Sequence, residues 1–360
     1  MAEKIKITPA KGRPMLNWVG KKPLDYVKGF PAQLMEVFDP LNNGKIVETP
    51  SYNELKNNWQ NLLFHGDNKD ALATLLELGF RGKVDLIYID PPFKSGADYV
   101  RKVELRGLKN LGQIQEDEVS VLQQTMYFDI WNNDTYLQFM YERLMLLKEL
   151  LSETGSIYVH LDWHVGHYIK LIMDEVFGQD NFQNDIVWYY PNKIPDKRKL
   201  CFTNASDRIL YYTKSDLSHT FNPQYKQVEP HKRAKEAKVN GVKQSLRDEN
   251  GDVVYETYEE RLLDNVWEIP SLAGSSHERL DFLTQKPEKL LERIIKASSN
   301  NNDLVLDCFI GSGTTLAVAQ KLHRRWIGCD INKGAIQLTA KRIAKIVKEQ
   351  TEKGDGLFDE

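Results

Sequence analysis

The sequence predicts an α/β protein whose core is a doubly wound, mostly parallel sheet with helices on both faces. Residues 61–90 show the order strand, helix, strand within about 30 residues, the length of a βαβ unit. Residues 303–330 show the same order, with a glycine-rich turn before the helix. A chain of 360 residues can bury a large core, so we expect one large α/β domain that carries an insert.

The overall composition is that of a globular protein from a reducing compartment. Apolar residues make up 41% of the chain and charged residues 28%, and the formal net charge is −3. No apolar run approaches the length of a membrane span, and residues 1–11 lack the apolar core of a signal peptide. The three cysteines, Cys201, Cys308 and Cys329, have neither disulfide nor zinc spacing. We therefore expect a cytoplasmic protein without membrane contact.

The first part of the chain leads into the first βαβ unit. Residues 1–58 are polar, with scattered prolines, and we expect an extension that packs on the main domain. Residues 61–65 are predicted to form a strand, and residues 69–79 have the apolar spacing of an amphipathic helix. The apolar run over residues 84–89 is typical of a strand that is buried on both faces of a parallel sheet.

The strand over residues 84–89 must end at Asp90, because Pro91 and Pro92 donate no backbone hydrogen bond and fix φ. The turn therefore holds the Asp90 carboxylate, the Pro91 carbonyl and the Phe93 ring at the carboxyl edge of the sheet. Open α/β sheets bind ligands at that edge, although a plain turn with a solvated acid is the alternative. The long polar loop 94–131 follows directly, and we expect it to be a lid or a binding loop.

The middle of the chain continues with alternating helices and strands and has no internal repeat. The predicted elements are a helix over 135–153 that Gly155 stops, a strand over 156–161, a helix over 164–177 that Gly178 ends, and strands over 186–190 and 208–213. His160, Asp162, His164 and His167 cluster around one strand end and resemble metal ligands at first sight. Ordinary packing or capping explains them equally well, and we expect no metal.

Residues 191–264 differ from the rest in their charge. From Pro191 to Arg247 there are 13 basic against 5 acidic residues, with aromatic residues between them, and the sign reverses from Asp248 to Asp264. A solvated insert is the plain interpretation, and a surface that contacts nucleic-acid phosphates is the functional one. The basic residues assigned to such contacts are Lys193, Lys197, Arg198, Lys199, Lys232 and Arg233.

The stretch 303–330 predicts a site for an adenosine-containing cofactor. Its first strand runs into Gly311-Ser312-Gly313-Thr314, where glycines allow close backbone approach and a helix N-terminus follows. Asp330, 19 positions after Gly311, ends the second strand and suits the hydroxyls of a ribose. Position 316 is Leu and no Gly-Lys-Ser/Thr triplet is present, which disfavours a dinucleotide and a P-loop nucleotide. S-adenosylmethionine fits, with Asp307 near its positively charged methionine end; a plain tight turn is the alternative.

The pairing of Asp90-Pro91-Pro92-Phe93 with Phe309-Ile310-Gly311-Ser312-Gly313-Thr314 resembles the amino-group DNA methyltransferases, which modify N6 of adenine or N4 of cytosine. The catalytic motif precedes the glycine motif, which is similar to the β class of that family. Residues 284–291 resemble the remaining cofactor motif of the class, and the likeness covers roughly residues 60–345. Two departures are Phe93, where Tyr is commoner, and the short recognition insert, which implies a short target or one that a second subunit helps to read.

The resemblance implies a Rossmann-like methyltransferase sheet, S-adenosylmethionine as cofactor and double-stranded DNA as substrate, in a bacterium or archaeon. A homodimer and a cognate restriction endonuclease are the further partners that it implies. Asp at the first position of the catalytic motif favours adenine N6, and N4 of cytosine is the alternative. Methylation of RNA or of a protein amide, and a non-catalytic DNA binder, remain as further alternatives, whereas C5-cytosine methylation lacks the cysteine that it requires.

The resemblance also implies roles for particular residues. The catalytic residues are Asp90, Pro91, Pro92 and Phe93. The cofactor-binding residues are Asp307, Phe309, Gly311, Ser312, Gly313, Thr314, Asp330, Lys286, Pro287, Asp67 and Asn68, although Asp67 and Asn68 serve equally well as a helix cap. The expected boundaries are 1–58 for the extension, 59–181 for the catalytic half, 182–274 for the target-recognition insert, 275–348 for the cofactor half and 349–360 for a polar tail.

Overall fold

The computed structural model places the central sheet as predicted, with nine strands in the order β15-β9-β10-β8-β5-β16-β17-β4-β3. The residues that the structure describes are 4–10, 12–29, 36–37, 50–92, 99–102, 123–127, 133–195, 200–215, 218–239, 242–280, 282 and 284–352. The strands of the sheet are β15 (Val266–Glu268), β9 (Phe182–Tyr189), β10 (Ser206–Thr213), β8 (Leu151–Leu161), β5 (Val84–Ile89), β16 (Leu304–Asp307), β17 (Arg325–Asp330), β4 (Leu62–His65) and β3 (Glu36–Val37).

The pairing directions explain why the sheet is mostly parallel. The five central strands, from β8 to β4, pair in parallel, as does β15 with β9. The strand β10 runs antiparallel to both β8 and β9, and the edge strand β3 runs antiparallel to β4. The carboxyl ends of β5, β16 and β17 therefore meet at one edge of the sheet, which is the edge that the sequence predicts for the site.

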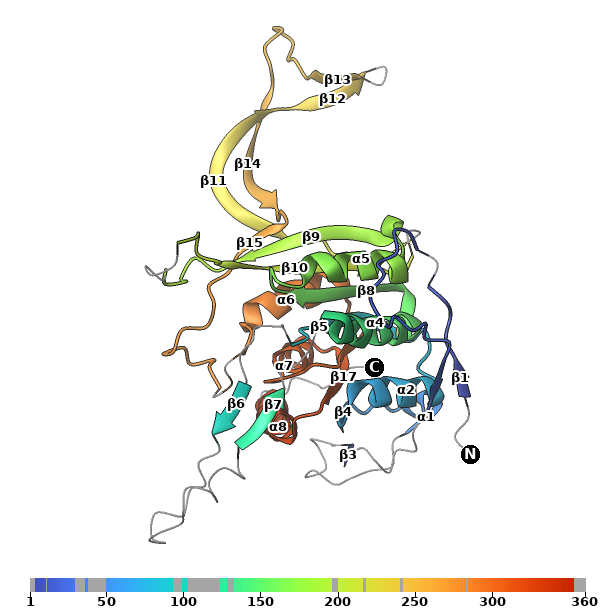
Figure 1. Ribbon diagram of the computed structural model, residues 1–360. Helices are drawn as coiled ribbons and strands as arrows, with labels where there is room; N and C mark the ends of the chain where they lie inside the picture. The colour runs from blue at the N-terminus through green and yellow to red at the C-terminus, as the bar shows by residue number, and fades with distance from the viewer. Residues whose placement is uncertain are drawn as a thin grey trace.

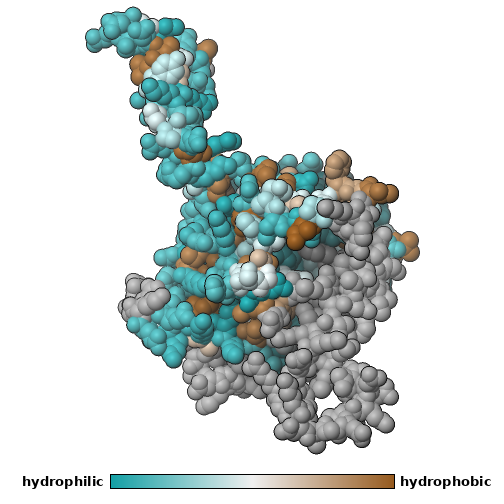
Figure 2. Space-filling model, turned by 90° about the vertical axis from the view of Figure 1, so that its left-hand side faces the viewer, coloured by the Kyte–Doolittle hydropathy of each residue, from teal (hydrophilic) through white to brown (hydrophobic). Residues whose placement is uncertain are grey.

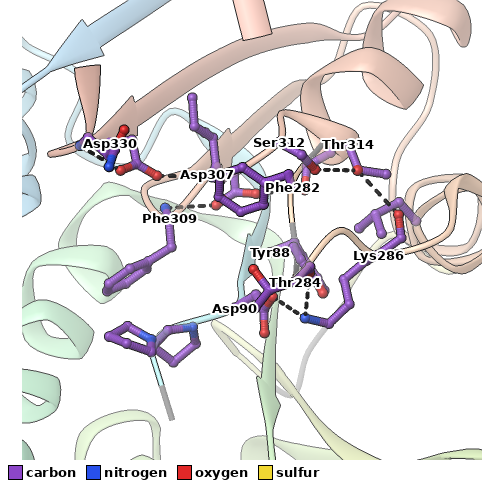
Figure 3. Close-up of a pocket in the computed structure, with 17 residues that line it drawn as sticks. Tyr88, Asp90, Phe282, Thr284, Lys286, Asp307, Phe309, Ser312, Thr314 and Asp330 are labelled. Atoms are coloured by element: carbon purple, nitrogen blue, oxygen red, sulfur yellow. Dashed lines mark hydrogen bonds and ion pairs between the residues drawn. The ribbon is translucent and has the colours of Figure 1, made fainter. Parts of the chain in front are cut away.

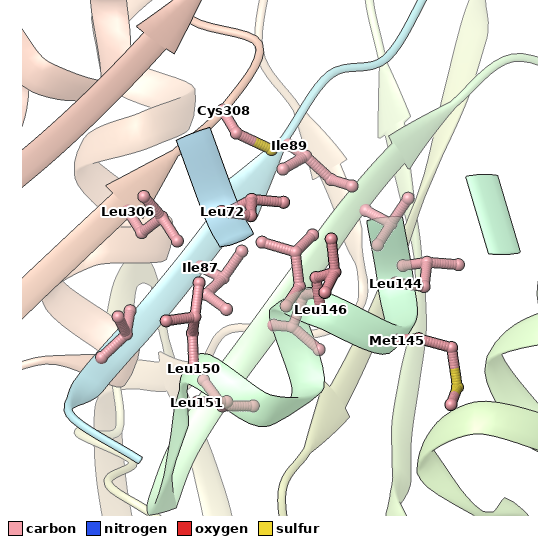
Figure 4. Packing of buried hydrophobic residues seen from close by; sticks show 14 of the residues in the cluster. Leu72, Ile87, Ile89, Leu144, Met145, Leu146, Leu150, Leu151, Leu306 and Cys308 are labelled. Atoms are coloured by element: carbon pink, nitrogen blue, oxygen red, sulfur yellow. The ribbon is translucent and has the colours of Figure 1, made fainter. Parts of the chain in front are cut away.

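Helices cover both faces of the sheet, in agreement with the doubly wound prediction (Figure 1). The helices α2 (Asn68–Glu77), α4 (Asn133–Leu150) and α5 (Gly166–Phe177) pack on one face, and α6 (Glu288–Ser298), α7 (Thr314–Lys321) and α8 (Lys333–Glu352) pack on the other. Because side chains alternate along a strand, Ile87 and Ile89 of β5 belong to the first core and Leu86 and Tyr88 to the second. Figure 4 shows the first core, where leucines of α4 point at β5.

The N-terminal segment packs on the main domain. Its short strands β1 (Lys4–Lys6) and β2 (Tyr26–Lys28) pair with each other, and α1 (Tyr52–Leu55) follows. Ile7 and Val27 are buried in the same core as α2 and α4. The Thr8 backbone N–H donates to Glu149 at 2.7 Å, which ties the segment to α4. The described part of this segment therefore packs against α2 and α4.

The end of α4 differs from the prediction. The helix stops at Leu150 and β8 begins at Leu151, so Gly155 lies inside a strand and does not stop the helix. The backbone N–H of Gly82 donates to the Glu149 carbonyl at 2.9 Å, and that of Lys83 donates to the Leu150 carbonyl at 3.0 Å. A neighbouring loop thus satisfies the last carbonyls of the helix, which a local sequence pattern does not reveal. Glycine is needed at 155 because a Cβ there would lie 3.0 Å from the Asp85 carbonyl oxygen.

The predicted insert 182–274 is divided between the sheet and a projecting arm. Its strands β9, β10 and β15 are members of the central sheet, so the boundary at residue 182 does not separate two structural units. The arm consists of β11 (Tyr225–Ala234) paired with β14 (Tyr255–Leu262), and β12 (Glu236–Val239) paired with β13 (Val242–Ser245). Figure 1 shows the arm rising away from the sheet, with β12 and β13 near its tip.

Two further segments complete the described chain. The helix α8 continues to Glu352, so the predicted tail does not begin at 349; Gln350 is buried and bonds Gln320 at 3.0 Å. Within the predicted loop 94–131, β6 (Tyr99–Lys102) pairs with β7 (Gln123–Tyr127), and the remaining residues of the loop lie outside the described part of the chain. The short 3₁₀ helix η3 (Gln179–Asn181) follows Gly178, which ends α5 as predicted. Within the described residues, every helix is too short or too polar to span a membrane.

Candidate active site

A pocket lies at the carboxyl edge of the sheet, where the chain leaves β5, β16 and β17 (Figure 3). It is lined by Tyr88, Asp90, Pro91, Pro92, Phe282, Thr284, Lys286, Leu291, Asp307, Phe309, Ile310, Gly311, Ser312, Thr314, Thr315, Asp330 and Asn332. The tertiary structure therefore brings together the two motifs that lie more than half the chain apart.

The Asp90 carboxylate is held from one side only. Its Oδ2 accepts a close charge-assisted bond from the ammonium of Lys286, which Figure 3 shows reaching across the pocket. Its Oδ1 is buried and has no hydrogen-bond partner among the described residues, while the nearest nitrogen of His160 lies 3.9 Å away. An unpaired acceptor in a pocket is a costly arrangement unless a ligand group completes it. Phe93, the third group of the predicted turn, lies outside the described residues.

The glycine turn before α7 requires glycine at both positions. Gly311 and Gly313 have φ of +50° and +72°, in the left-handed region that side chains rarely adopt. A Cβ at Gly313 would lie 2.5 Å from the Thr339 hydroxyl of α8, and one at Gly311 would lie 3.1 Å from the Phe282 ring. The backbone of the turn thus packs directly against its neighbours, and Gly311 lines the pocket.

The two acids predicted for the cofactor are buried, and both hold the glycine turn. Asp307 accepts from the Phe309 N–H at 2.9 Å and from the Thr315 hydroxyl at 2.6 Å. Asp330 accepts from the Gly311 N–H at 2.9 Å, and also from the backbone that follows β17. Burial raises the pKa of Asp307 to about 7 and that of Asp330 to about 6, against the hydrogen bonds that lower them. Both acids therefore favour a cationic or hydrogen-bond-donating ligand.

Comparison with known proteins identifies the family to which this site belongs. The family model described as DNA methylase, of the N6/N4 type, matches residues 84–341. The chain belongs to the N6/N4 DNA methylase family. The predicted family is thereby confirmed, and with it the reaction class, S-adenosylmethionine-dependent methylation of an amino group in DNA; the choice between adenine and cytosine stays open.

Curated methylases share sequence with most of this chain. The type II methyltransferase M.HpaI of Haemophilus parainfluenzae is 33% identical over 260 residues, which cover 72% of this chain and 68% of that protein. The type II methyltransferase M1.MboII of Moraxella bovis is 34% identical over 215 residues, which cover 56% of this chain and 76% of that protein. The DNA adenine methyltransferase YhdJ of Escherichia coli is 29% identical over 300 residues, which cover 80% of this chain and 88% of that protein.

A solved methylase structure matches less closely. The crystal structure of the M1.HpyAVI–SAM complex matches 78% of this chain and 98% of that chain, with a TM-score of 0.47 and 20% identity.

Some predicted cofactor residues of this DNA methylase lie elsewhere. Asp67 is the N-cap of α2, where it accepts from the Lys69 N–H at 2.7 Å and pairs with Arg143 at 3.0 Å. Asn68 donates to the Cys308 carbonyl at 3.1 Å. Asp67 has the capping role, neither side chain is among those that line the pocket, and the assignment of both residues to the cofactor stays a prediction.

Pro287 and Gly313 shape the pocket without lining it. Pro287 is the N-cap residue of α6, directly after Lys286, and Gly313 is the N-cap residue of α7. Each of the two residues therefore marks where a helix beside the pocket begins.

Several lining residues of the methylase were not singled out from the sequence. Phe282 and Asn332 have no local signal, because the first lies in an irregular segment and the second follows β17. Tyr88 carries a usable signal, since it stands two positions before Asp90 and therefore points to the same face of β5. Thr284 belongs to the segment that resembles a cofactor motif, and it was not assigned separately.

The histidine cluster divides into two arrangements in which the described residues form no group suited to a metal. Asp162 accepts from the backbone N–H groups of His164 at 3.0 Å and Val165 at 3.3 Å, which forms an Asx-type turn before α5. The ring of Trp163 stacks on His164, and both are exposed. His160 is fully buried behind Asp90 and contacts Tyr88 and Asp207.

The predicted DNA-contacting residues lie on separate elements of the methylase. Lys193 is exposed in the loop that follows β9, and Lys232 and Arg233 are exposed on β11 of the arm. Figure 2 shows the arm as a mostly hydrophilic surface that stands clear of the body. Lys197, Arg198 and Lys199 lie outside the described residues, so their assignment stays a prediction.

Proposed function

We propose that the chain transfers a methyl group from S-adenosylmethionine to the N6 amine of an adenine in double-stranded DNA. The observation that supports this most directly is the pairing of Asp90 with the glycine turn in one pocket. Asp90 and the glycine turn both line this pocket, and one carboxylate oxygen of Asp90 has no hydrogen-bond partner among the described residues. The two halves of a group transfer, an acceptor for the amine and a site for the donor, are then adjacent.

The chemistry of amine methylation explains why an acid and a carbonyl stand together. The lone pair of an exocyclic amine is delocalised into the base, which makes the nitrogen a poor nucleophile. Two acceptors on its two N–H bonds favour a pyramidal nitrogen whose lone pair can face the donor. Asp90 supplies a carboxylate and Pro91 a backbone carbonyl, which the following proline fixes. Acceptors that are already in place when charge develops stabilise the transition state.

The target base must leave the duplex to reach this pocket. Methyltransferases extrude their base, at a cost of a few kcal/mol. Phe93 follows Pro92 and is proposed to stack on the extruded base, a contact worth about 1–3 kcal/mol. Because the methyl donor is already activated, the protein contributes mainly by positioning the two reactants.

The cofactor is proposed to occupy the half of the pocket next to α7. S-adenosylmethionine supplies an electrophilic methyl group when it is bound. Asp330 would accept from the ribose hydroxyls, and Asp307 would face the positively charged methionine end. Their burial and raised pKa values suit a partner that carries positive charge or hydrogen-bond donors. Gly311 and Ser312, which line the pocket, would present the backbone edge to the adenosine.

Adenine N6 is proposed over cytosine N4 on two grounds. The catalytic turn begins with Asp, which the resemblance associates with adenine enzymes. The relative YhdJ, named a DNA adenine methyltransferase, covers 80% of this chain. Because other relatives are named type II methyltransferases, we also propose a role in a restriction–modification system, with a homodimer and a cognate endonuclease as partners.

The experiment that tests the proposal identifies the methylated base. The purified chain is incubated with isotope-labelled S-adenosylmethionine and DNA from a methylation-deficient host, and the nucleosides are separated and weighed by mass spectrometry. N6-methyladenine is the expected product, and sequencing of modified bases in the same DNA gives the target. N4-methylcytosine would replace the adenine assignment, and the absence of any labelled deoxynucleoside would refute DNA as the substrate.

A further inference from the structure

A chain of four polar side chains runs behind the catalytic turn. The Tyr88 hydroxyl lies 2.8 Å from Nδ1 of His160, and Nε2 of the same ring lies 3.3 Å from Asp207. The Tyr190 hydroxyl donates to the other oxygen of Asp207 at 3.4 Å. Tyr88 lies in β5, His160 in β8 and Asp207 in β10, and Tyr190 follows β9. Four separate parts of the chain therefore contribute to this one set of contacts.

The surroundings of His160 make it a fixed group. The side chain is 0% exposed, and the edge of its ring meets Trp188, with ring centroids 5.4 Å apart. Burial raises the pKa of Asp207, but the hydrogen bond and charge of His160, with Lys286 nearby, outweigh it and hold that pKa below its usual value. An ionised Asp207 accepts a hydrogen bond from Nε2, which leaves Nδ1 turned toward Tyr88 and Asp90.

We propose that His160, held by Asp207, is a positioning residue that limits rotation of the Asp90 carboxylate and so fixes the orientation in which it receives the target amine. This inference deepens the proposed function and rests on it, because it assumes that Asp90 receives the amine. Its basis is the geometry of the carboxylate: Oδ2 is taken by Lys286, and Oδ1 stands 3.9 Å from His160 Nδ1 without a partner among the described residues.

The effect of His160 concerns rotation of the Asp90 carboxylate. With Lys286 on one oxygen alone, the Asp90 side chain can turn and offer both oxygens to the ammonium. The rigid, buried ring behind Oδ1 opposes that turn by contact. The charged and titratable groups that face His160 are Tyr88 and Asp90 of the catalytic strand and Asp207 of β10, with Lys286 beyond Asp90. A small displacement of a reacting group can cost about 100-fold in rate.

The test compares variants of His160 with a matched control on the same strand. His160→Leu removes both nitrogens, and His160→Asn restores a polar atom near the position of Nδ1. Tyr158→Phe is the control, because Tyr158 is buried on the same face of β8 and loses a hydrogen bond of 2.7 Å to Ser298, away from the pocket. Asp207→Asn removes the charge that holds the ring.

We expect His160→Leu to lower kcat by roughly tenfold to a hundredfold, while the Kd for S-adenosylmethionine stays within about threefold. His160→Asn should retain more of the parent kcat than His160→Leu does. Asp207→Asn should also lower kcat, and Tyr158→Phe should leave kcat near the parent value. Equal kcat values for His160→Leu and Tyr158→Phe would overturn the inference. Should His160→Leu fail to fold, His160→Asn and Asp207→Asn carry the same comparison.

A crystal structure supplies a readout that does not depend on activity. In His160→Asn or Asp207→Asn we expect the Asp90 carboxylate to rotate toward Lys286, with Lys286 close to both oxygens. An unrotated carboxylate in both variants would refute the positioning role even if kcat falls. If the parent protein methylates no adenine but another acceptor, the same ratios are measured on that acceptor, so failure of the proposed function is seen separately.

Discussion

At the scale of the residue, the Asp90 carboxylate is held by groups from distant parts of the chain. Lys286, which the resemblance assigns to the cofactor and which lines the pocket, makes a close ion pair with Asp90. Both side chains are mostly buried, with 12% of Lys286 and 18% of Asp90 exposed. An ionised carboxylate only accepts hydrogen bonds, which is what the N–H groups of an amine require of a partner.

Replacing Asp90 with Ala is predicted to abolish methyl transfer, because the amine then loses its charged acceptor. Binding of S-adenosylmethionine should persist, since Asp90 is not among the groups proposed to hold it. Filter counting of labelled DNA measures the first effect, and calorimetric titration measures the second. Asp90→Asn, which keeps the shape but not the charge, is the matched control and should retain less than about 1% of the parent rate. Transfer at the parent rate by Asp90→Ala would remove it from the mechanism.

The raised pKa of Asp307 predicts pH-dependent cofactor binding. Without cofactor, burial holds the pKa near 7, well above the ordinary 3.8, so the carboxyl is largely protonated in mildly acidic solution. A cationic ligand favours the ionised form of Asp307. Below about pH 7, binding of such a ligand must therefore release the proton of this carboxyl. The affinity for S-adenosylmethionine should therefore rise with pH by up to about tenfold per unit until about pH 7, and then level off.

Calorimetric titrations in buffers of different ionisation enthalpy measure the Kd and the released proton together. Asp307→Asn, which cannot ionise, should flatten the pH dependence. An equally steep rise in that variant would assign the effect to another group, of which Asp330, with a pKa raised to about 6, is the first to test.

At the scale of the element, the glycine turn and α7 form one unit whose conformation is fixed by contact. The N-cap residue of α7, Gly313, is left-handed and packs against Thr339 of α8. Helix and turn therefore depend on each other, since the turn cannot relax without moving α8. The arrangement places the N-terminus of α7, with its favourable dipole, beside the pocket.

Three Gly→Ala substitutions are predicted to separate strain from contact. Gly313→Ala combines a φ of +72° with a Cβ 2.5 Å from the Thr339 hydroxyl. Gly82→Ala has a φ of +66° but nothing within 4 Å, and Gly274→Ala has neither strain nor contact. We expect little change for Gly274→Ala and a loss of about 1–2 kcal/mol for Gly82→Ala. Gly313→Ala should lose more than Gly82→Ala and bind the cofactor more weakly, as measured by urea unfolding and titration; equal losses would show that contact with Thr339 is unimportant.

At the scale of the whole molecule, the arm is a feature that contributes none of its described residues to the pocket. Its strands β11 and β14 pair only with each other, and an isolated two-stranded ribbon is marginally stable in water. Basic residues occupy β11 and acidic residues β14, with Arg233 opposite Glu256. A ribbon of this kind can enter the major groove, which suits the proposed role of this region in target recognition.

Shortening the arm is predicted to separate DNA binding from cofactor binding. Because Gln227 pairs with Glu260, residues 228–259 can be replaced by an Asn-Gly turn between these two positions. The shortened chain should keep its Kd for S-adenosylmethionine and lose DNA affinity, with a salt slope smaller by about 0.9 for each phosphate contact removed. Fluorescence anisotropy at several salt concentrations measures the slope.

A Lys345→Ser, Lys348→Ser double variant is the control for loss of exposed basic side chains elsewhere, because both lysines are exposed on α8 and lie away from the arm. It should change the slope little. An unchanged slope in the shortened chain would exclude the arm from the DNA interface. The assignment of Lys197, Arg198 and Lys199 is tested in the same assay by a triple serine variant, which should also flatten the slope.

The sequence by itself determined the features that depend on local stereochemistry. Two prolines must end a strand, so Asp90 and Pro91 were placed at the sheet edge, and paired glycines before a helix predicted the turn at Gly311. These motifs and their order were sufficient for the family. Only the tertiary structure decided where α4 ends, which strands of the insert join the sheet, that Lys286 reaches Asp90, and that His160 stands behind it. Each of these depends on groups far apart in the chain, whose contacts no local pattern encodes.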